Sequence, residues 1–218
     1  MVYQIYRANK PVIMTGREEK SWAGIKPLVI KNHMGMEPAH KPKVLAKLAY
    51  DDNALHVVFR VEDRYVRAVA PRHQTAVYKD SCVEFFFTPG VEVADGYINV
   101  EINCGGTVGM YYQLAPGKGR RPFTEGDIKK LAVMPSLPKI VNPEITKSTT
   151  WTIAYRLPYD LLANYCKVTK PASGVIWKGN FYKCADKTSH PHWLTWSPVD
   201  FPEPKFHMPQ CFGTLLFE

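Results

Sequence analysis

Short segments in which apolar and polar residues alternate recur along this chain, and proline and glycine separate them. In residues 54–62 every second side chain is apolar, beginning at Leu55 and continuing through Val57, Phe59 and Val61. Side chains of a β-strand point alternately to its two faces, so this pattern predicts a strand with one buried face. Eighteen prolines and fourteen glycines supply turns between such segments. Many short strands with frequent turns are typical of an all-β domain.

The same pattern predicts further strands at residues 44–50, 82–88, 97–103, 107–114, 130–134, 151–157, 175–184, 193–197 and 212–217. The clear helical segment is short and lies near residues 158–165. Pro158 suits the start of this helix, because the backbone N–H that proline lacks would have no hydrogen-bond partner within the first turn. We therefore predict a β-sandwich of antiparallel strands with one short helix and long loops, formed by residues 1–218 as a single domain. The long connections, which are candidates for function, span residues 11–42, 115–128 and 198–211.

Composition excludes several classes of partner. The net charge is +8, but the basic residues are scattered, and the densest cluster, GKGRR at 117–121, lies in a loop-like stretch. We therefore expect no nucleic-acid partner. No run approaches the roughly 18 apolar residues of a membrane helix. The start, MVYQIYRANK, lacks the apolar stretch of a secretory signal, which predicts a cytoplasmic protein, or a periplasmic or secreted one if a leader has been removed.

Cysteine and histidine spacing predicts no metal site. Five cysteines occur, at positions 82, 104, 166, 184 and 211, and they form no C-x-x-C pair. We interpret the strand cysteines as small apolar core residues. His190 and His192 would share one face of a strand, but no third ligand stands near them in the sequence.

Acidic and amide side chains interrupt two neighbouring predicted strands. Glu84 lies inside the apolar run CVEFFF, where an ionised group is costly unless it is paired or hydrogen-bonded. In YINVEIN, Asn99, Glu101 and Asn103 alternate with apolar residues and would share one face. Together these side chains predict a polar site that rests on a sheet.

Seven segments then resemble a known family in their order along the chain: YDDNALHVVFRVED, DSCVEFFF, YINVEIN, WTIAYRLPYDLL, GNFYKC, LTWSPV and FHMPQCFGTLLF. Over residues 44–218 they resemble the family 9 carbohydrate-binding modules of xylanases and their free-standing bacterial relatives. The resemblance implies a β-sandwich that binds a sugar between two aromatic rings without cleaving it. The ring positions fall on Tyr78 and Phe206 in this sequence.

The resemblance also implies polar contacts to the sugar. The family's glutamate corresponds to Glu84, a basic residue to Glu101, a glutamine to Tyr182 and another basic residue approximately to His190, so several positions differ in chemistry. With Asn103 added, the predicted binding residues are Tyr78, Phe206, Glu84, Glu101, Asn103, Tyr182 and His190. Calcium sites are known in the family, but the motifs place none here, and we expect no other cofactor.

The predicted function is therefore non-catalytic binding of the ends of plant-type or other oligo- and polysaccharides, in carbohydrate catabolism, with a separate glycoside hydrolase as a candidate partner. One alternative is a glycoside hydrolase that uses Glu84 and Glu101 as its carboxylate pair. Another is a haem-binding redox module of the related sandwich superfamily, with axial ligands from Met110, Met134, His207 and Met208.

Tryptophans divide into two expected groups. Trp151, Trp177 and Trp196 lie in predicted strands and are expected in the core. Trp22 lies in a loop-like stretch, KSWAG, from which its side chain would be able to reach a site on the sheet.

Overall fold

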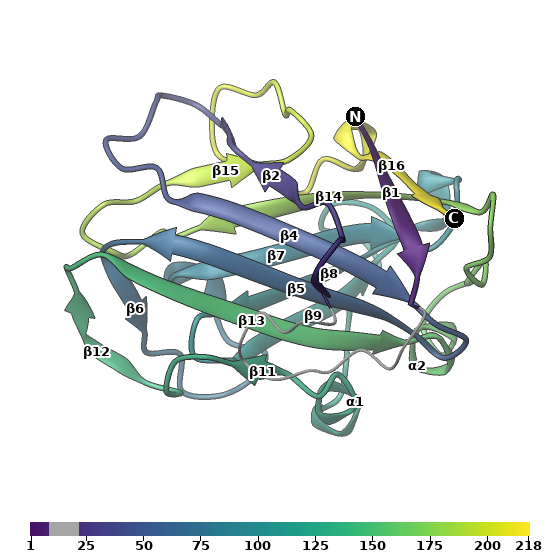
Figure 1. Ribbon diagram of the computed structural model, residues 1–218, viewed down its shortest axis with the longest axis horizontal. Helices are drawn as coiled ribbons and strands as arrows, with labels where there is room; N and C mark the ends of the chain where they lie inside the picture. Colours follow the sequence, from purple (N-terminus) through teal and green to yellow (C-terminus); the bar gives the residue numbers. More distant parts are fainter. Residues whose placement is uncertain (9–21) are drawn as a thin grey trace.

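The protein folds into two packed β-layers that belong to one curled sheet (Figure 1). The structure is a computed structural model and describes residues 1–8 and 22–218. One layer carries the candidate site. Its strands are β7 (Cys82–Thr88), β8 (Tyr97–Asn103), β9 (Val108–Gln113), β10 (Arg121–Pro122), β14 (Ile176–Cys184) and β16 (Gly213–Phe217).

The second layer covers the inner face of the first. Its strands are β2 (Leu28–Ile30), β4 (Lys43–Tyr50), β5 (Ala54–Asp63), β11 (Met134–Pro135) and β13 (Thr149–Pro158). Strand β1 (Val2–Arg7) joins the layers, because it pairs in parallel with both β16 and β4. Strands β3 (Asn32–His33) and β15 (Trp193–Thr195) extend the edge of β14, and β6 (Val66–Ala68) and β12 (Val141–Ile145) form a separate two-stranded sheet.

Period-two burial places the core between the layers. On β7, Val83, Phe85 and Phe87 face inward and are fully buried. The ring of Phe85 stacks on that of Phe181 from β14 at a centroid distance of 4.3 Å. A buried aromatic side chain of this kind contributes about 1.5–3 kcal/mol of transfer free energy. Residues 82, 84 and 86 therefore point away from the core, onto the outer face of this layer.

The predicted β-sandwich is confirmed, with three differences in detail. The sheet is mixed rather than wholly antiparallel, because β1 pairs in parallel with its neighbours. There are two short α-helices in the described chain instead of one, α1 (Glu125–Lys130) and α2 (Tyr159–Ala163). The predicted strand at 130–134 is wrong: its start is the end of α1, whose first turn is fixed by a capping box between Thr124 and Asp127.

The tryptophans separate according to layer. Trp151, Trp177 and Trp196 lie in the core, as predicted. Trp22 is also buried, but it packs against Ala49, Val58 and Ala154 on the outer face of the second layer. The expectation that Trp22 reaches the site is therefore wrong, because the whole sandwich stands between them.

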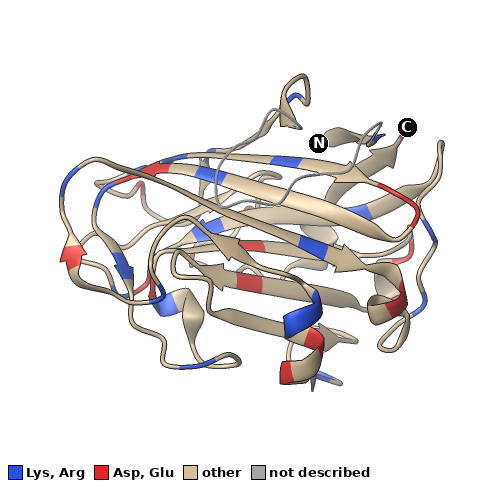
Figure 2. Ribbon diagram, turned by 60° about the horizontal axis from the view of Figure 1, so that its bottom comes forward, with Lys and Arg blue, Asp and Glu red and all other residues tan. Residues whose placement is uncertain are grey.

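Lysine and arginine residues are spread over strands, loops and α1 of the described chain (Figure 2). None of the helices in the described ranges has the length and apolar character needed to cross a membrane.

Candidate functional site

A cavity of about 730 Å³ lies over the outer face of β7, β8, β9 and β14. Its floor consists of outward-facing side chains of these strands: Glu84, Phe86, Glu101, Tyr111, Gln113 and Cys184. The period of two along each strand accounts for this floor, since the intervening residues are buried in the core. The sequence-based prediction of a polar site resting on a sheet is consistent with this placement.

Aromatic side chains stand at the walls of the cavity. Tyr78 belongs to the 3-10 helix η2 (Val77–Lys79), and the residue is 41% exposed. Phe206 comes from the loop before β16, and its ring stacks on that of Tyr182 at 4.3 Å. The Tyr182 hydroxyl also donates to the Phe206 carbonyl oxygen at 3.0 Å. The sheet therefore holds the Phe206 ring in place, so that little side-chain conformational entropy is lost when a ligand binds there.

The floor carries two buried glutamates opposite each other. Glu84 on β7 pairs in register with Glu101 on β8. Burial raises the pKa of Glu84 well above 4.5, and nearby Cys184 and Glu101 raise it further. Burial likewise raises the pKa of Glu101 to about 7. Burial therefore favours the neutral carboxyl form of Glu84, and a neutral carboxyl offers an O–H donor as well as an acceptor.

A chain of amides orients the second glutamate. The Asn99 side-chain amide donates to Glu101 Oε1 at 2.8 Å, and Gln113 Nε2 donates to Asn99 Oδ1 at 2.9 Å. His207 lies at the end of this chain, because its Nδ1 is 3.3 Å from Gln113 Nε2 and also 2.8 Å from the Tyr97 hydroxyl. These partners fix the rotamers on the floor and leave the cavity lined by both donors and acceptors.

Four of the seven predicted binding residues, Tyr78, Glu84, Glu101 and Phe206, meet at this cavity. Tyr182 lies beneath Phe206 and supports it. Asn103 is placed elsewhere: its amide donates to Asp80 Oδ2 at 2.9 Å, and its oxygen accepts from the backbone N–H groups of the following turn.

His190 does not line the cavity. Its ring stacks on that of Tyr65 at 3.6 Å, and its Nδ1 is 2.9 Å from the Ser189 hydroxyl. We therefore leave Asn103 and His190 out of the site that the cavity defines.

Sequence reasoning missed several residues of the cavity, among them Gln113, Arg120, Cys184 and Trp193. Gln113 follows Tyr111 by two residues on β9 and shares its outward face, so the strand pattern contained a signal for it. Arg120 lies in the long loop 115–128, and its guanidinium carbon is 3.6 Å from the centroid of the Tyr111 ring. Its place depends on how that loop folds back over β9.

The residues proposed as haem ligands are dispersed. Met110 faces the core and is fully buried, whereas Met134 is 41% exposed on β11 in the other layer. His207 is in the cavity wall, and Met208 packs beside it against the aromatic cluster of Phe86 and Tyr182. The arrangement does not favour the haem alternative, because the methionines and the histidine do not face one another across a common space.

A sandwich that carries an aromatic-walled polar cavity on the outer face of one sheet has the form of a ligand-binding module. The chain belongs to carbohydrate-binding family 9, whose sequence model matches residues 19–217. This is a family of non-catalytic binding modules. A search of the curated proteins finds no match to the chain.

Solved structures share the fold. A protein from Bacteroides uniformis ATCC 8492, provisionally described as carbohydrate-binding, is 28% identical, with a TM-score of 0.86 over 100% of this chain and 99% of its own. A family 9 module from Caldicellulosiruptor kristjanssonii is 16% identical in its glucose complex, with a TM-score of 0.66 over 99% of this chain and 96% of that one. Its cellotriose complex gives 15% identity and a TM-score of 0.67, over 99% and 94%.

Calcium sites are known in the family, but the one cluster of possible metal ligands among the described residues does not suit calcium. Among the described residues, one group of three His, Cys, Asp or Glu side chains brings its ligand atoms together, and it consists of Cys82, Glu84 and Cys184. Calcium binds oxygen ligands, and two of these three donors are sulfur. We assign no role to calcium in the site.

Proposed function

We propose that the protein binds the end of an oligo- or polysaccharide chain in this cavity and does not cleave it. The observation that carries the proposal is the combination of aromatic walls with a buried floor of donors and acceptors. A pyranose ring has apolar C–H faces, which stack on aromatic rings, and a rim of hydroxyls, which need both donors and acceptors. Tyr78 and Phe206 supply rings, and Glu84, Glu101 and Gln113 supply the polar groups.

The complexes of the Caldicellulosiruptor module with glucose and cellotriose make gluco-oligosaccharides the first ligands to test. Xylo- and manno-oligosaccharides widen the range to other plant polysaccharides. In this proposal the protein acts in carbohydrate catabolism, holding chain ends near a separate glycoside hydrolase.

The test is a glycan array followed by calorimetry with the best ligand. Tyr78→Ala removes one stacking ring, and losing about 1–3 kcal/mol of apolar burial weakens affinity by roughly ten- to a hundred-fold. Because Tyr78 is 41% exposed, we expect the melting temperature to change little. Tyr6→Ala is the matched control, since Tyr6 is 50% exposed and lies on β1, away from the cavity.

Equal losses in both variants, or none in Tyr78→Ala, would place the site elsewhere. Hydrolysis is tested in the same samples by measuring released reducing ends, and we expect none. If reducing ends appear and Glu84→Gln abolishes them while the variant stays folded, the protein is a glycosidase and the proposal is wrong.

A further inference from the structure

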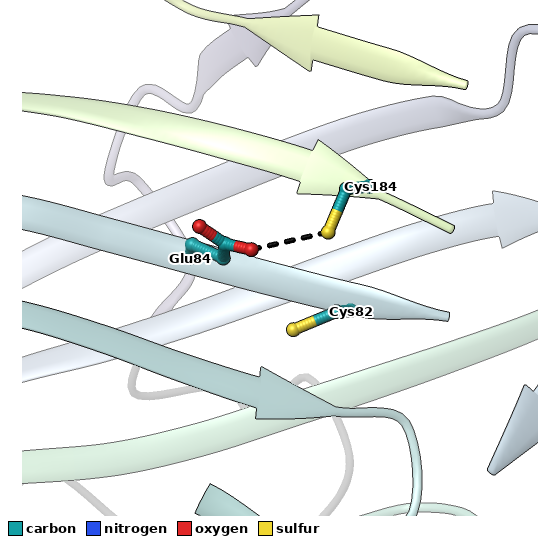
Figure 3. A group of neighbouring side chains, drawn as sticks. All are labelled: Cys82, Glu84 and Cys184. Atoms are coloured by element: carbon teal, nitrogen blue, oxygen red, sulfur yellow. Dashed lines mark hydrogen bonds between the residues drawn. The ribbon is translucent and has the colours of Figure 1, made fainter. Parts of the chain in front are cut away.

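Two cysteines that stand far apart in the sequence meet at the floor of the cavity, where Cys184 lines the cavity and Cys82 lies beside it on the neighbouring strand. Cys82 and Cys184 lie directly opposite each other in the register of β7 and β14. Both are buried, with exposures of 0% and 1%. Glu84 follows Cys82 by two residues on the same face of β7, so its carboxyl group lies near both sulfur atoms and accepts a hydrogen bond from Cys184 (Figure 3).

We propose that Cys82, Glu84 and Cys184 form a binding site for a thiophilic divalent cation, with Zn²⁺ as the ion that fits the donors. Their ligand atoms lie within 4.8 Å of one another, and Cys184 Sγ is 3.1 Å from Glu84 Oε1. Around a tetrahedral zinc, two sulfur ligands stand about 3.8 Å apart, and sulfur and oxygen about 3.6 Å apart. Small side-chain rotations therefore suffice to close the three donors around one ion.

The surroundings support an ion at this place. Glu84 and Cys184 line the cavity, which provides a path of entry and leaves a coordination position open to water or a ligand. Three protein ligands with one exchangeable position are the arrangement of zinc sites that remain accessible. On the opposite face of β14, Lys183 Nζ donates to the Cys184 carbonyl oxygen at 2.9 Å and pairs with Asp63 Oδ2 at 3.4 Å, which holds the backbone at Cys184 in place.

Binding would exchange protons for metal. Each thiol S–H bond, and the O–H bond of the Glu84 carboxyl where it is protonated, loses its proton to solvent and is replaced by a bond to zinc, and no electron is transferred. Zinc therefore competes with protons for these ligands.

The experiment uses the full chain, reduced and freed of metal by chelation, dialysed against Zn²⁺ alone. We expect one zinc per chain by elemental analysis, and Co²⁺ in its place should give the absorption of thiolate-to-metal charge transfer. Cys184→Ser and Cys82→Ser should each weaken Zn²⁺ binding by more than about a hundred-fold. Substitutions of residues that only support the metal ligands typically cost about ten- to a hundred-fold in affinity. Cys166→Ser is the matched control, because that partly buried thiol lies outside the group.

If a serine variant fails to fold, Glu84→Gln tests the third ligand and should weaken Zn²⁺ binding while keeping the Co²⁺–thiolate absorption. The proposal is overturned if the reduced chain takes up no zinc, if Cys184→Ser and Cys166→Ser bind it equally, or if Cys82 and Cys184 form a disulfide that persists after reduction and zinc addition. Zinc uptake requires no sugar, so failure of the carbohydrate proposal leaves this test unaffected.

Discussion

The titration of Glu101 should make the stability of the protein depend on pH. Burial raises the pKa of this carboxyl from 4.5 to about 7 in the folded state. Between pH 4.5 and about 7 the folded chain therefore keeps a proton on Glu101 that the unfolded chain has released. The stabilisation from this group is fully present below pH 4.5 and is lost as the pH rises through 7. At about 1.4 kcal/mol per pKa unit, the whole change is about 3 kcal/mol.

Glu101→Gln replaces the carboxyl by an uncharged amide of the same shape, which keeps an oxygen to accept from Asn99. We expect urea unfolding at pH 5 to give nearly equal free energies for the variant and the parent protein. At pH 8 the variant should be more stable by about 2–3 kcal/mol, because it carries no buried charge. Glu92→Gln, at an exposed glutamate, is the control and should show no such change. An equal difference at pH 5 and pH 8 would refute the reasoning.

Two further predictions concern the scaffold and are measured by urea unfolding. Phe181→Ala should destabilise the fold by about 3–5 kcal/mol, because this ring is fully buried between those of Phe85 and Trp196 and its removal leaves a cavity; a loss below 1 kcal/mol would mean that the layers repack. Thr124→Ala should cost about 1 kcal/mol, because its hydroxyl accepts from the Asp127 backbone N–H at the start of α1; no loss would show that tertiary contacts alone hold the helix.

The candidate site was partly readable from the sequence. Glu84 and Glu101 stood out because each interrupts an apolar pattern on a predicted strand, and the structure pairs them in register. The family resemblance added Tyr78 and Phe206, and both are at the cavity walls. Asn103 fitted the same pattern as Glu101, yet its side chain is used to fix the turn after β8. A period of two identifies the outward face of a strand, but not where along that face a cavity lies.

The prediction of a strand at residues 130–134 is wrong for a local reason. Residues 130–134 contain leucine, alanine and valine and suit a strand by composition. The capping box at Thr124 begins a helix five residues earlier, and that helix carries the chain through Lys130. A short-range hydrogen-bond pattern at the start of an element here outweighed the composition of the residues that follow.

The sequence by itself determined the layers of this protein, because burial of alternate side chains requires each strand to place one face against another sheet. Only the tertiary structure decided which outward-facing side chains meet. The register between β7 and β14 sets Cys184 beside Cys82 and Glu84, although about a hundred residues separate them in the chain. Such proximity follows from backbone hydrogen bonding between distant strands, and a shift of one residue would turn these side chains to the other face.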